Sequence, residues 1–175
     1  FGWSTAITSN TLVVGAYRDD ATSLNSGSAY IFTYNTNNSN YEVNQKIIPT
    51  SAVAESFAGY SVAIDNDTLV VGCYGDDVSG SNQAGSAQVY FRSGNLWTLS
   101  SELTANDFGA SDYFGWSVSL SSDGTIVSGA AYSSGTNGYA KVYKYTDGSW
   151  NQMGQNIIGL ASGDKSGYTA LSGDG

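Results

Sequence analysis

The chain has 175 residues, of which 41% are hydrophobic and only 12% are charged. This length suits one folded domain with a packed core. The formal net charge is −9, from 6 basic and 15 acidic residues, so the surface would repel nucleic acids and anionic membranes. No apolar stretch approaches the roughly 18 residues that cross a bilayer. We therefore expect no nucleic-acid partner and no membrane insertion.

Few residues are suited to catalysis. The chain contains no His and a single cysteine, Cys73. Nucleophilic catalysis needs a base beside the nucleophile, and histidine usually supplies it. The lysines follow no catalytic pattern, and no pair of carboxylates marks a shared cleft. We therefore predict that the chain is not an enzyme. Cys73 cannot form an internal disulfide and is expected to be an inert core thiol.

An internal repeat organises the sequence. The stretch "NTLVVGAYRDD", which begins at Asn10, returns as "DTLVVGCYGDD" from Asp67. Gly15, Gly72 and Gly129 mark the same place in three copies, 57 positions apart each time. A repeat of this length indicates one structural unit per copy, stacked on its neighbours. We place the copies at about 1–56, 57–113 and 114–166, with the start of a fourth at about 167–175.

Each copy begins with a predicted β-hairpin. The first strand reads "STAI", "SVAI" or "SVSL". The turn residues that follow are Ser9-Asn10, Asn66-Asp67 and Asp123-Gly124, which tolerate the positive φ of a tight hairpin turn. The second strand, "TLVVGA", "TLVVGC" or "TIVSGA", is almost continuously apolar. That pattern is typical of a strand covered on both faces.

A second predicted hairpin completes each copy. Its first strand is "SAYIFTY", "SAQVYFR" or "YAKVYKY", with small or branched residues alternating with aromatic ones in the first copy. The turns "RSGN" and "TDGS" lead to a last strand that opens with Tyr41, Trp97 or Trp150. No window shows the helical period of about 3.6 residues. The sequence therefore predicts an all-β chain with four antiparallel strands per copy.

Four-stranded units of this size that stack side by side indicate β-propeller blades. The openings Phe1-Gly2-Trp3-Ser4 and Phe114-Gly115-Trp116-Ser117 would place an aromatic residue at the contact between blades. The glycine, matched by Gly59 in the second copy, would allow close backbone approach. We predict about three consecutive blades, a partial propeller, because a closed ring has about four to eight. Further blades or another chain would cover the open edges.

These openings, with the tripeptides that begin at Gly15, Gly72 and Gly129, resemble the FG-GAP repeat family. Blades of this family build the propeller head of integrin α chains. The second copy departs from the pattern at Phe57-Ala58-Gly59, and the proline of "GAP" is missing in all three copies. The resemblance covers essentially the whole chain. Because these repeats occur in many secreted proteins, it implies an extracellular or cell-surface location.

The resemblance is poor evidence for one particular function. The leading hypothesis is a non-catalytic module for adhesion or protein–protein interaction. One alternative is a structural protomer of a cell-surface filament or appendage. Another is an accessory domain of a larger secreted hydrolase. The expected partner is a protein, or copies of this chain, bound through blade edges and loops.

Two aspartate pairs, Asp19-Asp20 and Asp76-Asp77, recur in the loop after the second strand, where the third copy has Ser133-Ser134. Integrin-type FG-GAP blades hold calcium in a loop patterned Asp-x-Asp-x-Asp-Gly-x-x-Asp, which is absent here. The pairs have two interpretations: they cap turns through their own backbone, or they bind calcium together with backbone carbonyls. A second acidic set, expected mainly to brace loops, comprises Asp107, Asp112 and Asp164.

Two features could involve carbohydrate. The tryptophans could stack on glycans, although their repeated positions favour core packing; they are Trp3, Trp97, Trp116 and Trp150. N-glycosylation sequons begin at Asn37 and Asn66. The first lies in a polar loop that a glycan would reach more easily than the tight turn that holds the second.

Overall fold

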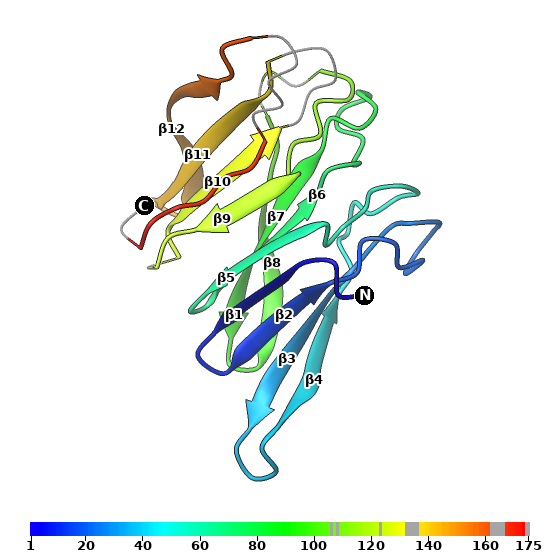
Figure 1. The fold of residues 1–175 in the computed structure, drawn as a ribbon, viewed down its shortest axis with the longest axis vertical. Coiled ribbons are helices and arrows are strands. Elements are labelled where there is room, and N and C mark those ends of the chain that lie inside the picture. Colours follow the sequence, from blue (N-terminus) through cyan, green and yellow to red (C-terminus); the bar gives the residue numbers. More distant parts are fainter. Residues whose placement is uncertain (106, 108, 123, 132–136, 162–166, 174–175) are drawn as a thin grey trace.

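The computed structural model describes residues 1–105, 107, 109–122, 124–131, 137–161 and 167–173. Within these residues, the strands form three antiparallel four-stranded sheets (Figure 1). Blade one contains β1 (Thr5–Thr8), β2 (Thr11–Gly15), β3 (Ala29–Asn35) and β4 (Asn40–Ile47). Blade two contains β5 (Ser61–Asp65), β6 (Thr68–Cys73), β7 (Ser86–Ser93) and β8 (Leu96–Leu103). Blade three contains β9 (Ser117–Leu120), β10 (Ile126–Ala131), β11 (Tyr139–Thr146) and β12 (Ser149–Ile158).

The strands of each sheet pair in chain order, which confirms the prediction of an all-β chain with four antiparallel strands per copy. Across the described residues no helix is long and apolar enough to span a membrane. The predicted residues Asp123, Ser133-Ser134 and Asp164 lie outside the described part of the chain.

Turn chemistry sets the hairpins. β1 and β2 are joined through Ser9-Asn10, and β5 and β6 through Asn66-Asp67, as predicted. Ser9 and Asn66 have φ values of 42° and 47°. This left-handed region is disfavoured for bulky side chains, so short polar residues suit these turns. All residues of β6 are buried, which is the double coverage that its apolar run predicts.

The three sheets stack as propeller blades. Their inner strands β1, β5 and β9 lie side by side, and the sheets fan outward from them (Figure 1). Ile31 of blade one and Leu69 of blade two share one core cluster. Val89 on the opposite face of blade two packs in a second cluster with Phe114 of blade three. Because side chains alternate along a strand, blade two offers one apolar face to each neighbour.

Gly72 allows successive blades to approach at backbone distance. A Cβ on Gly72 would lie within 3.0 Å of the carbonyl oxygen of Gly115, at the start of blade three. The Ser61 Oγ donates to that same carbonyl oxygen at 2.8 Å. Gly15 lies in the same way against the carbonyl of Gly59. The glycine is therefore needed because a side chain has no room there.

The third blade differs in register. Ser61 lies opposite Gly72, whereas Ser117 lies opposite Ala130, so Gly129 does not occupy the register position of the other repeat glycines. The connection between β9 and β10 is longer than the two-residue turns of the other blades. The longer connection shifts the pairing, and a one-residue shift moves a position to the other face of the sheet. Gly129 consequently lies against the ring of Phe114.

The position of the first aromatic in each opening varies between blades. Phe114 is fully buried, and its ring centroid lies 6.2 Å from that of Tyr143. Phe1 is 77% exposed and meets Tyr30 edge-on at 5.3 Å. In blade two Ala58 takes this place, because Ala58 and Phe114 form the same parallel bridge with the preceding blade. Phe57 instead joins a loop cluster of rings.

Residues 167–173 run beside β9 (Figure 1). The backbone N–H groups of Thr169 and Leu171 donate to the hydroxyl oxygens of Ser117 and Ser119 at 3.1 and 3.0 Å. The segment packs beside β9 of blade three in the way that β5 packs beside β1 of blade one. It therefore occupies the place of the next inner strand.

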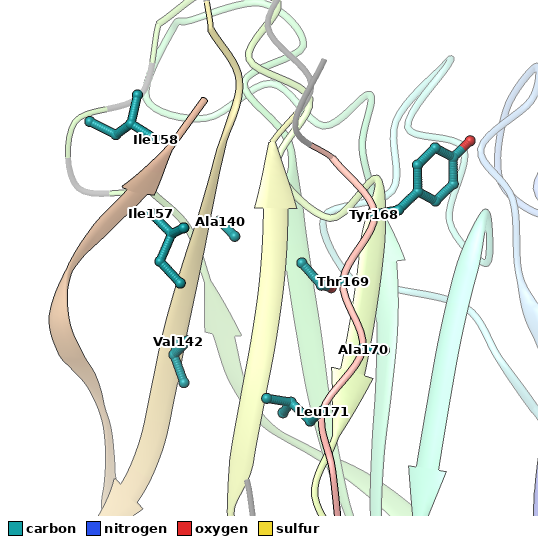
Figure 2. A pocket seen from close by; sticks show the side chains of 8 residues that line it. All are labelled: Ala140, Val142, Ile157, Ile158, Tyr168, Thr169, Ala170 and Leu171. Atoms are coloured by element: carbon teal, nitrogen blue, oxygen red, sulfur yellow. The ribbon is translucent and has the colours of Figure 1, made fainter. Parts of the chain in front are cut away.

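A groove of about 430 Å³ separates this segment from β11 and β12. Figure 2 shows Ala140, Val142 and Ile157 on one side and Leu171 on the other. Ala140 pairs with Ile157 as Ala29 pairs with Ile47 in blade one. The blade-one pair is buried, whereas Ile157 is 63% exposed. In blade one, the face that carries Ala29 and Ile47 is covered by blade two. The equivalent face of blade three lines the groove.

Candidate functional site

Four aromatic residues lie just before the inner strands and in the terminal segment: Trp3, Tyr60, Trp116 and Tyr168. We call these residues the aromatic row. The ring centroids of Trp3 and Tyr60 are 5.4 Å apart, and those of Tyr60 and Trp116 are 4.6 Å apart. Tilted aromatic pairs at such distances stabilise a contact beyond the area that they bury. The openings therefore place aromatic residues where successive blades meet, as the sequence predicted.

Further rings support the row from the loops. Tyr17 and Tyr74 follow the repeat glycines by two residues, and the centroid of Tyr74 lies 4.7 Å from Tyr60 and 4.9 Å from Trp116. Phe57 stacks on Tyr74 at 4.9 Å. Burial raises the pKa of Tyr74 to about 12. Sequence reasoning missed this supporting layer, although the recurrence of Tyr directly after Gly-Ala or Gly-Cys was its signal.

The aromatic row borders a hollow of about 300 Å³. Its lining is completed by Ser4, which precedes β1, and by the inner-strand residues Ser61, Val62 and Ser117. Among the described residues, no charged side chain lines it. Trp3 and Tyr168 are 55% and 84% exposed, whereas Tyr60 and Trp116 are half-buried. Two ring surfaces are therefore open to a ligand.

The tryptophans do not share one environment. Trp97 is 3% exposed in the core between blades one and two. Its backbone N–H donates to the side chain of Gln45 at 2.8 Å, and its carbonyl accepts from the same side chain at 2.9 Å. Trp116 and Trp150 are half-buried. The expectation of core packing holds for Trp97 but is wrong for Trp3, which lies at the surface beside the hollow.

In blade one, the two adjacent aspartates have different partners. The Asp19 Oδ2 accepts hydrogen bonds from Ser28 Oγ at 2.5 Å and from Lys46 Nζ at 2.7 Å. Burial would raise the pKa of Asp19, but the hydrogen bonds from Lys46 and Ser28 hold it below its ordinary value. The Asp20 Oδ1 accepts from the backbone N–H of Asn25 at 2.7 Å, which is a turn-capping bond.

Blade two repeats this division. The Asp77 Oδ1 accepts from the backbone N–H of Gln83 at 2.8 Å. Asp76 is 2% exposed, and its Oδ2 accepts from Ser86 Oγ at 2.5 Å and from Ser51 Oγ at 3.2 Å. Burial raises the pKa of Asp76 to about 6. Hydroxyl groups hold the carboxylate of Asp76, whereas the carboxylate of Asp19 in blade one also accepts from the ammonium group of Lys46.

The acids between blades two and three brace their loop. The Asp112 Oδ2 accepts from the backbone N–H of Gly109 at 2.6 Å and from the Tyr139 hydroxyl at 3.4 Å. Asp107 forms an ion pair with Lys141, whose side chain is only 2% exposed. These contacts tie the loop to β11, which is the bracing role expected from the sequence.

The predicted calcium ligands do not converge. Within the described residues, no three Asp, Glu, His or Cys side chains gather closely enough to hold a metal ion. A cation beside Asp19 would have to displace the ammonium of Lys46, which disfavours calcium in blade one. Asp20 and Asp77 are engaged by backbone amides. Calcium binding by the Asp76-Asp77 loop stays a prediction.

The two sequons differ in how freely their amides are presented. Asn37 is exposed in the loop between β3 and β4. The Asn66 Nδ2 donates to the carbonyl of Ser122 at 2.8 Å across the contact with blade three. A glycan on Asn66 would be attached to the nitrogen that donates this bond, at the contact with blade three, whereas one on Asn37 would project from an exposed loop. Cys73 is fully buried, and burial raises the pKa of its thiol well above the ordinary value.

A family model for the FG-GAP repeat matches residues 1–32, 41–90 and 97–143. The chain belongs to the FG-GAP repeat family. Its three matched segments follow the repeat seen in the sequence. Each includes the first hairpin of one FG-GAP blade, and the second and third segments begin in the last strand of the preceding blade. No curated protein sequence matches the chain.

Solved structures share the fold of these FG-GAP blades. A protein from Lactobacillus plantarum aligns with a TM-score of 0.51 and 16% identity, covering 86% of this chain and 38% of that one. The periplasmic gluconolactonase PpgL of Pseudomonas aeruginosa aligns with a TM-score of 0.50 and 18% identity, covering 83% of this chain. The FG-GAP chain spans 38% of either structure. Likeness at this identity establishes the β-propeller fold and leaves function to the site.

Proposed function

We propose that this chain is an extracellular, non-catalytic recognition module that serves adhesion or protein–protein interaction. The observation that carries the proposal is the aromatic row, which presents Trp3 and Tyr168 beside the hollow. Tryptophan and tyrosine supply large contact areas at low conformational cost and are enriched at binding hot spots. Membership of the FG-GAP family supports an extracellular or cell-surface location.

The polar groups near the row hold the blades together. The hydroxyls of Ser4 and Ser61 donate to backbone carbonyls of the next blade at 2.8 Å. The buried Cys73 has a raised pKa, the opposite of an activated nucleophile. These observations favour binding over hydrolysis, although one structural neighbour is a gluconolactonase. Gluconolactone hydrolysis by the chain above the uncatalysed rate would contradict the non-catalytic assignment.

The adhesion proposal is tested on a panel of immobilised collagen, fibronectin, cellulose, chitin and peptidoglycan. We expect the chain to bind at least one surface, and the double variant Trp3→Ala plus Tyr168→Ala to bind it at least about tenfold more weakly. Tyr168 is largely exposed and Trp3 more than half exposed, so the variant should stay folded, with a melting temperature lowered only by the lost ring contacts of Trp3. Failure to bind any surface, or equal binding by the variant, rejects the proposal.

A specific observation favours a second candidate, a structural protomer that assembles through its blade faces. Apolar side chains are exposed on blade three at the groove, and Ile7 and Val43 of blade one are 60% and 62% exposed. Exposed apolar patches mark interaction surfaces. Light scattering at increasing concentration tests it: a growing mass that Ile157→Asp abolishes supports assembly, and a constant monomer mass rejects it.

A further inference from the structure

The hollow beside the aromatic row has the chemical character of a sugar-binding subsite. We propose that it binds a neutral glycan, an oligosaccharide without carboxylate or sulfate groups. The inference rests on the proposed recognition function and names the ligand of that same site. A volume of about 300 Å³ lies in the usual range of small-ligand sites and accommodates part of an oligosaccharide.

The ring surfaces provide the apolar half of the site. Trp3 and Tyr168 are 55% and 84% exposed while lining the hollow with the half-buried Tyr60 and Trp116. Tyr168 lines both the groove and the hollow, and Figure 2 shows its side chain projecting away from Ile157 and Leu171. A pyranose ring carries C–H groups on its faces, and these pack against an aromatic surface. Tyr and Trp add a polar end that reaches the sugar hydroxyls.

Serine hydroxyls provide the polar half. Ser4 Oγ and Ser61 Oγ each donate their one proton to a backbone carbonyl at 2.8 Å. Each oxygen then keeps lone pairs that accept hydrogen bonds from a ligand. Ser117 of blade three also lines the hollow, but its Oγ already accepts from the backbone N–H of Thr169 at 3.1 Å. Ser4 and Ser61, beside the open rings, therefore supply the acceptors for a ligand that repeats hydroxyl donors along its length.

Charge selects against ionic ligands. No charged side chain lines the hollow within the described part of the chain, and the protein carries a net charge of −9. An anion would lose its hydration without gaining a cation. A cation would need ring faces on several sides, as in an aromatic cage. The rings of Trp3, Tyr60 and Trp116 instead pack on one another in sequence, with centroids 5.4 and 4.6 Å apart, so part of each ring surface is taken up by its neighbour.

The test is calorimetric titration of the full chain with hexasaccharides of cellulose, chitin, laminarin and mannan, beside a heparin hexasaccharide and choline. We expect at least one neutral hexasaccharide to bind. Trp3→Ala and Tyr168→Ala should each weaken that binding at least about tenfold. Tyr41→Ala is the matched control, because Tyr41 is a 40% exposed aromatic that contacts Tyr34 away from the hollow. It should bind like the parent chain.

Binding of heparin or choline without any neutral hexasaccharide overturns the inference, as does neutral binding that both variants keep. Binding of no hexasaccharide also overturns it. The panel of immobilised surfaces separates the two proposals. Retention on collagen or fibronectin that depends on Trp3 and Tyr168, without oligosaccharide binding, rejects the glycan ligand and leaves the recognition function standing.

Discussion

Lys46 on β4 and Glu102 on β8 occupy the same register position in successive blades and carry opposite charges. Lys46 neutralises Asp19 at 2.7 Å. The counterpart of Asp19 in blade two is Asp76, which is deeply buried and has an acidic residue where blade one has a basic one. One repeat thus stabilises an ionised aspartate, while the next disfavours ionisation at the same place.

The pH dependence of stability should report this difference. Burial, aided by Glu102, raises the pKa of Asp76 from 3.8 to about 6. Between these values the folded state holds a proton that the unfolded state has released, so Asp76 makes stability fall as pH rises. The slope is about 1.4 kcal/mol per pH unit at most. Above pH 6 the contribution is constant.

Asp76→Asn removes this titration and keeps the shape of the side chain. We expect the stability of the variant relative to the parent to increase between pH 4 and pH 6 and then level off, in urea unfolding at four pH values. The lowered pKa values of Asp19 and Asp107 make stability rise with pH over their own titration range. This contribution is the same in the variant and the parent, so it cancels in the difference. A stability difference that is independent of pH would contradict the prediction.

Gly72→Ala should destabilise the fold through overpacking. The added Cβ would lie within 3.0 Å of the Gly115 carbonyl oxygen, so two blades must separate. We expect a loss of about 1–3 kcal/mol in the free energy of unfolding, and more for Gly72→Val. Gly109→Ala is the control, because a Cβ there meets Asp112 at an ordinary 3.5 Å. Equal denaturation midpoints for Gly72→Ala and the parent would refute close approach.

Calcium binding by the Asp76-Asp77 loop can be measured by thermal melting. If this loop binds calcium, calcium raises the melting temperature of the parent chain and EDTA reverses the shift, because a ligand of the folded state stabilises it by mass action. Asp76→Ala combined with Asp77→Ala should abolish the shift. Asp19→Ala combined with Asp20→Ala should retain it. The same shift in both double variants would place the metal elsewhere.

The buried ammonium of Lys141 should make Asp107 sensitive to substitution. Asp107→Asn leaves a 2% exposed lysine without its counter-charge. We expect a loss of about 2 kcal/mol in the free energy of unfolding, less than the roughly 3–5 kcal/mol of a fully buried pair. The loss is smaller because the Asp107 side chain is 57% exposed. Adding Lys141→Met should restore most of it in urea unfolding, and a further loss would contradict a charge effect.

Much of the fold could be predicted because its signals are local. Turn residues such as Ser9 and Asn66 define the hairpins, and the apolar run of β6 indicates burial on both faces. The register of blade three could not be predicted in this way. It depends on a longer connection, and Gly129 still matches the repeat in sequence although Ala130 takes the place opposite Ser117.

The candidate site was only partly predictable. The sequence indicated aromatic residues at the blade contacts, but its repeated positions suggested the same core role for Trp3 and Trp97. Only the tertiary structure separates them, since Trp97 is enclosed by two sheets and Trp3 lies beside an open hollow. The same holds for the aspartate pairs, because hydrogen-bond partners distant in sequence decide which carboxylate is buried.

By itself, the sequence determined that this chain is all-β, built from repeated four-stranded blades, and poor in catalytic groups. Alternation, turn residues and composition suffice for that, because each acts over a few neighbouring positions. The tertiary structure alone decided which rings converge, which acids pair with a cation and which faces stay open. Those features depend on contacts between segments that are distant in the sequence, such as those of Lys46 with Asp19 and of Ser51 with Asp76.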